Sequence, residues 1–129
     1  MIIFYTPFYI HIRGCFDLDI SVHYENNNSV EILSKSLRQI LTDKTVLLCV
    51  GTDRCIGDVL GPLIGTMLQK KNFRFPVYGT LDNPIHAINI EKFIHSVYKL
   101  YPAGLFVAID ACLGHEESIG IIRIKKGPI

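Results

Sequence analysis

The sequence predicts an α/β fold with three layers, α/β/α, built around a mostly parallel sheet. Two short apolar runs, at residues 46–50 and 105–109, have the composition of strands that are buried on both faces. Segments with helical periodicity lie before, between and after such runs, so helix and strand alternate along the chain. Strands that are joined through helices pair in parallel and place the helices on the faces of the sheet.

The first half of the chain predicts two helices and one strand. The Asn-rich residues 26–29 are typical of a helix start, and the helix is expected over residues 30–41. A strand over residues 45–50 and a glycine-containing loop follow, and a second helix begins near Asp58. Pro62 is acceptable there because it falls in the first turn. The expected buried stripes are Val30, Leu33, Leu37, Ile40 and Leu41 in the first helix, and Val59, Leu60, Leu63, Ile64, Met67 and Leu68 in the second.

The second half continues the alternation. A strand over residues 75–79 leads into Asp-Asn-Pro, and Pro84 predicts the first helical position of a helix that ends near Tyr98. Strands are expected over residues 105–109 and 118–124. Because the chain stops directly after a strand, we expect the architecture to be incomplete at its C-terminal end.

Composition points to a single globular domain. The chain has 129 residues, of which 49% are hydrophobic and 19% charged. The formal net charge of +1 gives no bulk attraction to nucleic acid or to an anionic membrane, so neither is an expected partner. We expect residues 1–21 to be an N-terminal extension that adds an edge strand or stays irregular, and residues 22–129 to be the domain.

The four cysteines contain no CxxC pair, which argues against a zinc ribbon or a thioredoxin motif. We therefore expect reduced thiols and a cytoplasmic location. The N-terminal apolar segment lacks the basic region and the cleavage site of a signal peptide and is too short to span a bilayer.

Asp58 and Asp110 are the strongest candidates for function. Each follows a predicted buried strand or its loop, and the strands at 45–50 and 105–109 are expected to be neighbours. A parallel sheet presents functional groups at the carboxyl ends of its strands. Two carboxylates that meet there would have split pKa values, one suited to an acid and the other to a base. Taken singly, each Asp could equally be a helix cap or a turn residue.

Other residues near this edge have weaker claims. Asp53 and Arg54 are candidate substrate contacts, although a surface ion pair would explain them as well. Cys55 and Cys112 flank this edge, and a Cys–His nucleophile is an alternative there, but a reactive thiol needs a lowered pKa that sequence does not reveal. His115 is near Asp110 and could complete a metal site, although a single His in a loop more often faces solvent. The nearby glycines, among them Gly51, do not form GxGxxG or a P-loop, so we interpret them as turn and close-packing residues and expect no cofactor and no metal.

Four stretches carry a resemblance to a known family: VHYE (22–25), LLCVGTDRCIGDVLGPLIG (47–65), VYGTLDNPIHAINI (77–90) and AIDACLG (108–114). On these the chain resembles the YyaC family of sporulation proteins, which are described as spore proteases. More distantly it is similar to the germination protease of spores and to HybD-like hydrogenase maturation endopeptidases. The resemblance implies a phosphorylase/hydrolase-like α/β/α fold.

The resemblance also implies roles for the two aspartates. In the germination protease an Asp-Ala-Leu-Gly-Pro motif carries one catalytic Asp, and the motif that begins at Asp58 matches it. The second catalytic Asp ends a strand, as Asp110 does. The implied function is an aspartate-dependent endopeptidase of sporulation or germination. The alternatives are a non-catalytic sporulation protein that binds a peptide or protein in the same cleft, and a metal-binding maturation-type endopeptidase.

Overall fold

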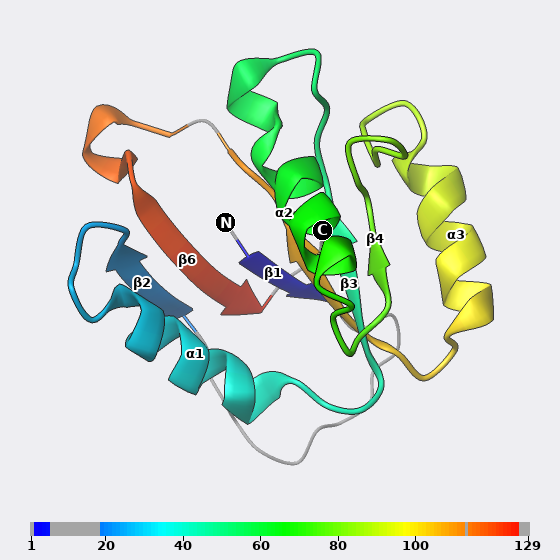
Figure 1. The fold of residues 1–129 in the computed structure, drawn as a ribbon, viewed down its shortest axis with the longest axis horizontal. Helices are drawn as coiled ribbons and strands as arrows, with labels where there is room; N and C mark the ends of the chain where they lie inside the picture. Colours follow the sequence, from blue (N-terminus) through cyan, green and yellow to red (C-terminus); the bar gives the residue numbers. More distant parts are fainter. Residues whose placement is uncertain (1, 6–18, 113, 127–129) are drawn as a thin grey trace.

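The computed structural model describes residues 2–5, 19–112 and 114–126, which form one mixed α/β unit (Figure 1). Its strands are β1 (Ile2–Tyr5), β2 (Asp19–His23), β3 (Thr45–Cys49), β4 (Val77–Tyr78), β5 (Leu105–Ile109) and β6 (Ile121–Lys126). Its α-helices are α1 (Ser29–Ile40), α2 (Leu60–Lys70) and α3 (Ile90–Leu100), and two short 3₁₀ turns are η1 (Ile56–Asp58) and η2 (Glu116–Ser118).

The strands form a single sheet in the order β2-β6-β1-β5-β3-β4. The strands β4, β3 and β5 are parallel, and β3 lies beside β5 as the sequence predicts. The other half is mixed, because β1 is antiparallel to β5 and parallel to β6, while β2 and β6 are antiparallel. Strand β1 is not at the edge of the sheet, because it pairs on both sides, whereas β2 is an edge strand. Most of the expected N-terminal extension, residues 6–18, lies outside the described residues. β2 was not expected as a strand, and it is held as the antiparallel partner of β6.

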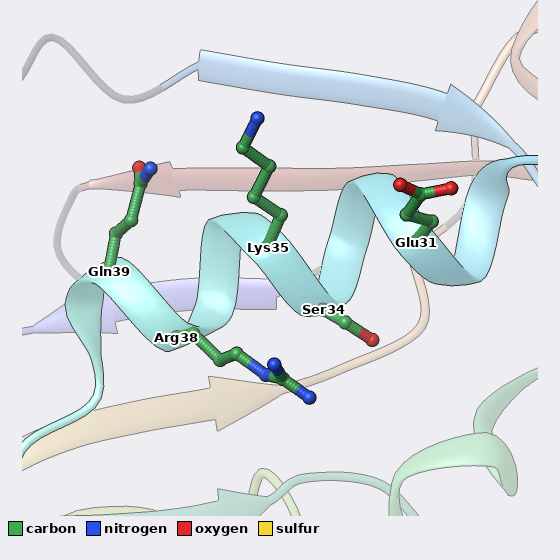
Figure 2. A pocket seen from close by; sticks show the side chains of 5 residues that line it. All are labelled: Glu31, Ser34, Lys35, Arg38 and Gln39. Atoms are coloured by element: carbon green, nitrogen blue, oxygen red, sulfur yellow. The ribbon is translucent and has the colours of Figure 1, made fainter.

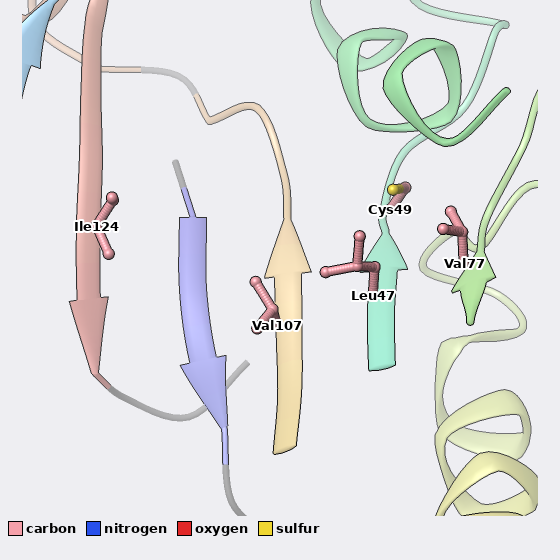
Figure 3. Close-up of a cluster of buried hydrophobic side chains, with 5 residues drawn as sticks. All are labelled: Leu47, Cys49, Val77, Val107 and Ile124. Carbon is pink, nitrogen blue, oxygen red and sulfur yellow. The ribbon is translucent and has the colours of Figure 1, made fainter. Parts of the chain in front are cut away.

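Apolar side chains pack against both faces of the sheet. On one face Leu47, Cys49, Val77, Val107 and Ile124 form a buried cluster that α1 and α2 cover (Figure 3). On the other face the buried cluster contains Val46, Leu48, Ile85, Val97 and Phe106, and α3 contributes Val97 together with Ile90, Phe93 and Tyr98. The alternation of inward residues along β3 and β5 therefore serves two cores, which explains why these strands are apolar throughout.

The helix expected at Pro84 begins six residues later, at Ile90. The Asn89 side chain holds the preceding loop: its Oδ1 accepts from the His86 N–H at 2.9 Å and its Nδ2 donates to the Pro84 carbonyl at 3.0 Å. Within this loop Ile85 bridges to Val50 at the end of β3. The segment after Pro84 therefore contacts the sheet instead of starting a helix, and this contact buries Ile85, which is only 1% exposed.

The predicted inner stripes need correction. Val30 is exposed on α1, whereas Leu33 and Leu37 pack on the core. On α2 the buried residues are Gly61, Pro62 and Gly65, while the larger Leu60, Leu63 and Met67 are exposed. The last strand starts at Ile121 rather than residue 118, because η2 and Gly120, with a φ of 80°, come first.

Candidate functional site

Asp58 and Asp110 lie at the same edge of the sheet, where β3 and β5 end. Cys49 and Ile109 are paired in the parallel ladder, and the Val50 N–H donates to the Ile109 carbonyl at 2.8 Å. Asp110 therefore begins its loop directly beside the last residues of β3.

The backbone of Asp58 reaches this edge through the loop after β3. Its carbonyl accepts from the Thr52 N–H at 3.1 Å, and its own N–H donates to the Cys55 carbonyl at 2.9 Å. Gly51, with a φ of 143°, lies so close that an added Cβ would overlap the Asp58 carbonyl oxygen. A side chain at position 51 would push Asp58 away from the edge, so this glycine positions the aspartate.

The start of α2 is held against β3 in the same way. An added Cβ at Gly61 would overlap the Val50 carbonyl oxygen, and one at Gly65 would overlap the Gly79 carbonyl oxygen. Of the three glycines that superficially suggest a nucleotide loop, Gly51 and Gly61 thus serve close backbone packing, as the sequence predicts, whereas an added Cβ at Gly57 would meet nothing within 4 Å. Asp58 precedes the first residues of α2 instead of lying within its first turn, because η1 ends at Asp58.

Electrostatics connect the two aspartates. Burial raises the pKa of Asp110 above its ordinary value of 3.8, the negative charge of Asp58 raises it further, and a hydrogen bond from the Ala111 backbone opposes the shift. Both side chains are half-buried. A raised pKa favours the protonated form, and a carboxyl group of this kind beside a second carboxyl group is suited to act as an acid next to a base.

The loop after β4 forms the next part of this edge. The Gly51 N–H donates to the Ile85 carbonyl at 2.7 Å, which ties the loop to β3. Thr66 on α2 fixes the loop's beginning, since its hydroxyl accepts from the Leu81 N–H at 3.0 Å and donates to the Pro62 carbonyl at 2.9 Å. The sequence analysis missed both residues. The contact of Ile85 has no local signal, because it depends on where the loop returns to the sheet.

The other candidate site residues from the sequence analysis are exposed to solvent. Asp53 and Arg54 are exposed on the loop after β3, and Cys55, Cys112 and His115 are exposed as well. Among the described residues, no group of three or more His, Cys, Asp and Glu side chains is arranged to share a metal ion.

Two surface hollows lie elsewhere. One, of about 330 Å³, is at the amino edge of the parallel strands and is lined by residues such as Pro76, Leu100 and Tyr101. The other, of about 570 Å³, is on α1 and is lined by Glu31, Ser34, Lys35, Arg38 and Gln39 (Figure 2). These five side chains spread outward from the helix instead of converging on one point. Neither of these two hollows is lined by Asp58 or Asp110.

A family model described as "Protein of unknown function (DUF1256)" matches residues 21–129, which is most of the chain. The chain belongs to the DUF1256 family. It is also 46% identical over 99 residues to the "Uncharacterized protein YyaC" of Bacillus subtilis (strain 168), which confirms the YyaC resemblance. That match covers 76% of this chain and 48% of the relative, so the chain spans about half the length of the curated protein it matches. No solved structure matches.

The match to this DUF1256 family model includes both candidate aspartates and the loops that hold them. Neither printed description assigns an activity. No α-helix in the described ranges is long and apolar enough to cross a membrane.

Proposed function

We propose that this chain carries the catalytic core of an aspartate-dependent endopeptidase that acts on a protein or peptide in the cytoplasm of a sporulating or germinating cell. The observation that supports it is the pKa of Asp110, raised partly by the charge of Asp58 at the same sheet edge. The proposal also draws on the similarity to the germination protease and its phosphorylase/hydrolase-like α/β/α fold, which is an argument by analogy.

The proposed chemistry uses the two carboxyl groups in different states. The raised pKa of Asp110 favours its protonated form, so Asp110 acts as the acid, while Asp58 acts as the base. Asp58 takes a proton from a water molecule, and the water oxygen attacks the scissile carbonyl. Asp110 donates its proton to the carbonyl oxygen. When the tetrahedral intermediate collapses, the C–N bond breaks and the leaving amine takes the proton from Asp58. Asp110 takes back a proton from one hydroxyl group of the intermediate as the carbonyl re-forms, so both carboxyl groups return to their starting states.

Asp53 and Arg54 are proposed to contact the substrate backbone. Both are exposed on the loop that carries Asp58, which makes them accessible to a polypeptide lying along the edge. Their loop is anchored to Asp58 by the Thr52 N–H, so a substrate held there would stay in register with the carboxylates.

The test is a cleavage assay on a spore-protein mixture, with new termini detected by mass spectrometry. Asp58→Asn and Asp110→Asn are each expected to reduce cleavage at least about 100-fold while the fold is kept. Asp53→Asn is the matched control, since it changes an exposed carboxylate on the same loop and should alter substrate affinity more than turnover. Wild-type cleavage by the Asp58→Asn, Asp110→Asn double variant would refute the proposal.

A binding protein without catalysis is the second candidate. It is favoured by the exposure of Asp53 and Arg54 on the loop beside the two carboxylates, because exposed charged side chains can hold a partner without any chemistry. In that case the wild-type chain would capture a partner from the same mixture without producing new termini. Substitution of Asp53 or Arg54 would then weaken capture as much as substitution of Asp58.

A further inference from the structure

The outer face of α2 and of the turn before it carries an exposed apolar stripe. Its members are Ile56, Leu60, Leu63 and Met67, whose exposed fractions are 94%, 48%, 41% and 51%. The spacing of Leu60, Leu63 and Met67 places them along one side of α2, and Ile56 lies in the 3₁₀ turn η1 just before the helix. A periodic apolar face is normally turned towards a core, and this one is turned towards solvent.

The opposite face of α2 explains this orientation. Small residues meet the sheet there, since Gly61 lies against the Val50 carbonyl and Gly65 against the Gly79 carbonyl. The larger side chains cannot replace them at such a short distance. Helix α2 lies on the same side of the sheet as α1 (Figure 1). It is therefore apolar on both sides, because its small residues Gly61 and Gly65 lie against the backbone of the sheet region and its large ones are exposed.

The charges at the two ends of the stripe are opposite. Asp53 and Arg54 precede the stripe, Asp58 lies between its first two members, and Lys70 and Lys71 follow its last, so the start carries a net negative charge and the end a positive one. Lys70 and Lys71 are exposed one turn after Met67 and continue the same face. A surface with an acidic end, an apolar centre and a basic end is complementary to itself after a two-fold rotation. The antiparallel arrangement also pairs opposite helix dipoles.

We propose that the stripe binds a second copy of this chain through antiparallel packing of α2 against α2. A stable interface covers roughly 800 Å² on each partner, and four side chains supply only the apolar centre of such an area. The lysines and the acidic loop residues supply the polar rim. We therefore expect a reversible dimer with a dissociation constant in the micromolar range.

The dimer also bears on the proposed function, on which this part of the inference rests. Asp58 follows Ile56 by two residues, so the acidic end of the stripe is at the candidate site. Lys70 and Lys71 of the second copy would lie beside that end and provide a wall for the candidate site. The site would then be a cleft formed between two copies.

Sedimentation-velocity centrifugation over roughly 1–300 µM tests the interface without any substrate, in the affinity range of reversible complexes. The wild type is expected to change from monomer to dimer with concentration. The Leu63→Glu, Met67→Glu variant should raise the dissociation constant at least tenfold, and so should the Lys70→Glu, Lys71→Glu variant. Val30→Glu is the matched control, since it changes an exposed aliphatic residue on α1 and should leave the constant within twofold. Circular dichroism melts verify that each variant is folded.

A wild type that stays monomeric at all these concentrations would overturn the inference. So would a dimer that the folded stripe variant leaves intact. A monomer whose stripe variants lose cleavage would assign the stripe to substrate contact, which also overturns it. A stripe-dependent dimer that cleaves nothing would instead count against the proposed function alone.

Discussion

Gly51 lies directly against the backbone of Asp58. An added Cβ at position 51 would overlap the Asp58 carbonyl oxygen and would lie 2.9 Å from Pro62 Cδ, and the φ of 143° is itself unfavourable for other residues. One glycine at the end of β3 therefore fixes how close the loop with the candidate aspartate can come to the sheet.

Gly51→Ala should accordingly lower the free energy of unfolding by about 2 kcal/mol or more, because it adds both a steric overlap and backbone strain. Gly57→Ala is the matched control on the same loop, where an added Cβ has no neighbour within 4 Å. We expect that variant to stay within about 0.5 kcal/mol of wild type. Urea denaturation measures both changes. Equal stability of the two variants would show that the close approach of Gly51 and Asp58 is not a constraint.

The buried aromatic ring of Phe106 is predicted to be a major source of stability. It is 0% exposed and its ring centroid lies 4.6 Å from that of Tyr98 on α3. Phe106→Ala should cost about 3–5 kcal/mol, since it removes the ring and leaves a cavity between β5 and α3. Ile88→Ala, at a site that is 87% exposed, is the control and should be nearly neutral. A loss below about 1 kcal/mol for Phe106→Ala would contradict the packing of α3 on this face.

Thr66 should matter through its hydroxyl group. Thr66→Val keeps the shape but removes the acceptor of the Leu81 N–H and the donor to the Pro62 carbonyl, and we expect a loss of about 1–2 kcal/mol. Thr66→Ser keeps both hydrogen bonds and should lose less. Amide hydrogen exchange at Leu81 gives an independent reading, with faster exchange in the valine variant alone. Unchanged exchange there would argue against the hydrogen bond between α2 and the loop after β4.

The thiol of Cys49 should not react with alkylating reagents in the native protein. Burial raises its pKa to about 12, so the reactive thiolate is absent at neutral pH. Cys55 and Cys112 are exposed. Iodoacetamide followed by peptide mapping should therefore modify Cys55 and Cys112 under native conditions and reach Cys49 only after denaturation. Rapid native labelling of Cys49 would contradict its place in the core beside Leu47.

Local signals were sufficient for the central part of the fold. The apolar runs at β3 and β5 gave the two parallel strands, and α1 begins and ends within one residue of the expected helix. The orientation of α2 was not predictable from periodicity, because its small residues, including Gly61 and Gly65, form the contact face in place of its large ones. The positions of β1 and β2 in the sheet were not predictable from local sequence either. β1 pairs with β5 and β6, and β2 pairs with β6, and these partners are about 100 residues away along the chain.

The candidate site was similarly predictable only in part. Its two aspartates follow from the rule that parallel strands present residues at their carboxyl ends. Ile85 and Thr66, which support the same edge, could not be derived, because their roles arise from hydrogen bonds between segments that are distant in sequence.

The ionisation of Asp110 should also affect stability. Its pKa is raised in the folded state, so folding favours the protonated form, and stability should fall as pH rises from about the unfolded value of 3.8 through the higher folded value. Asp110→Asn removes this penalty and should make the protein more stable than wild type at pH 7, with the gain fading below the unfolded pKa. Thermal melts across this pH range measure the effect. A variant that is less stable than wild type at pH 7 would mean that the ionised Asp110 is stabilised by its surroundings.

The most direct test of the central claim is the pKa of Asp110 itself, followed by the ¹³C chemical shift of its carboxyl group. In the wild type the pKa should lie above 3.8, and Asp58→Asn should lower it, since one of the two causes of the shift is the charge of Asp58. Asp53→Asn, on the same loop, should leave it unchanged. If Asp58→Asn does not move the Asp110 pKa, the two carboxyl groups do not act as a pair and the proposed site is wrong.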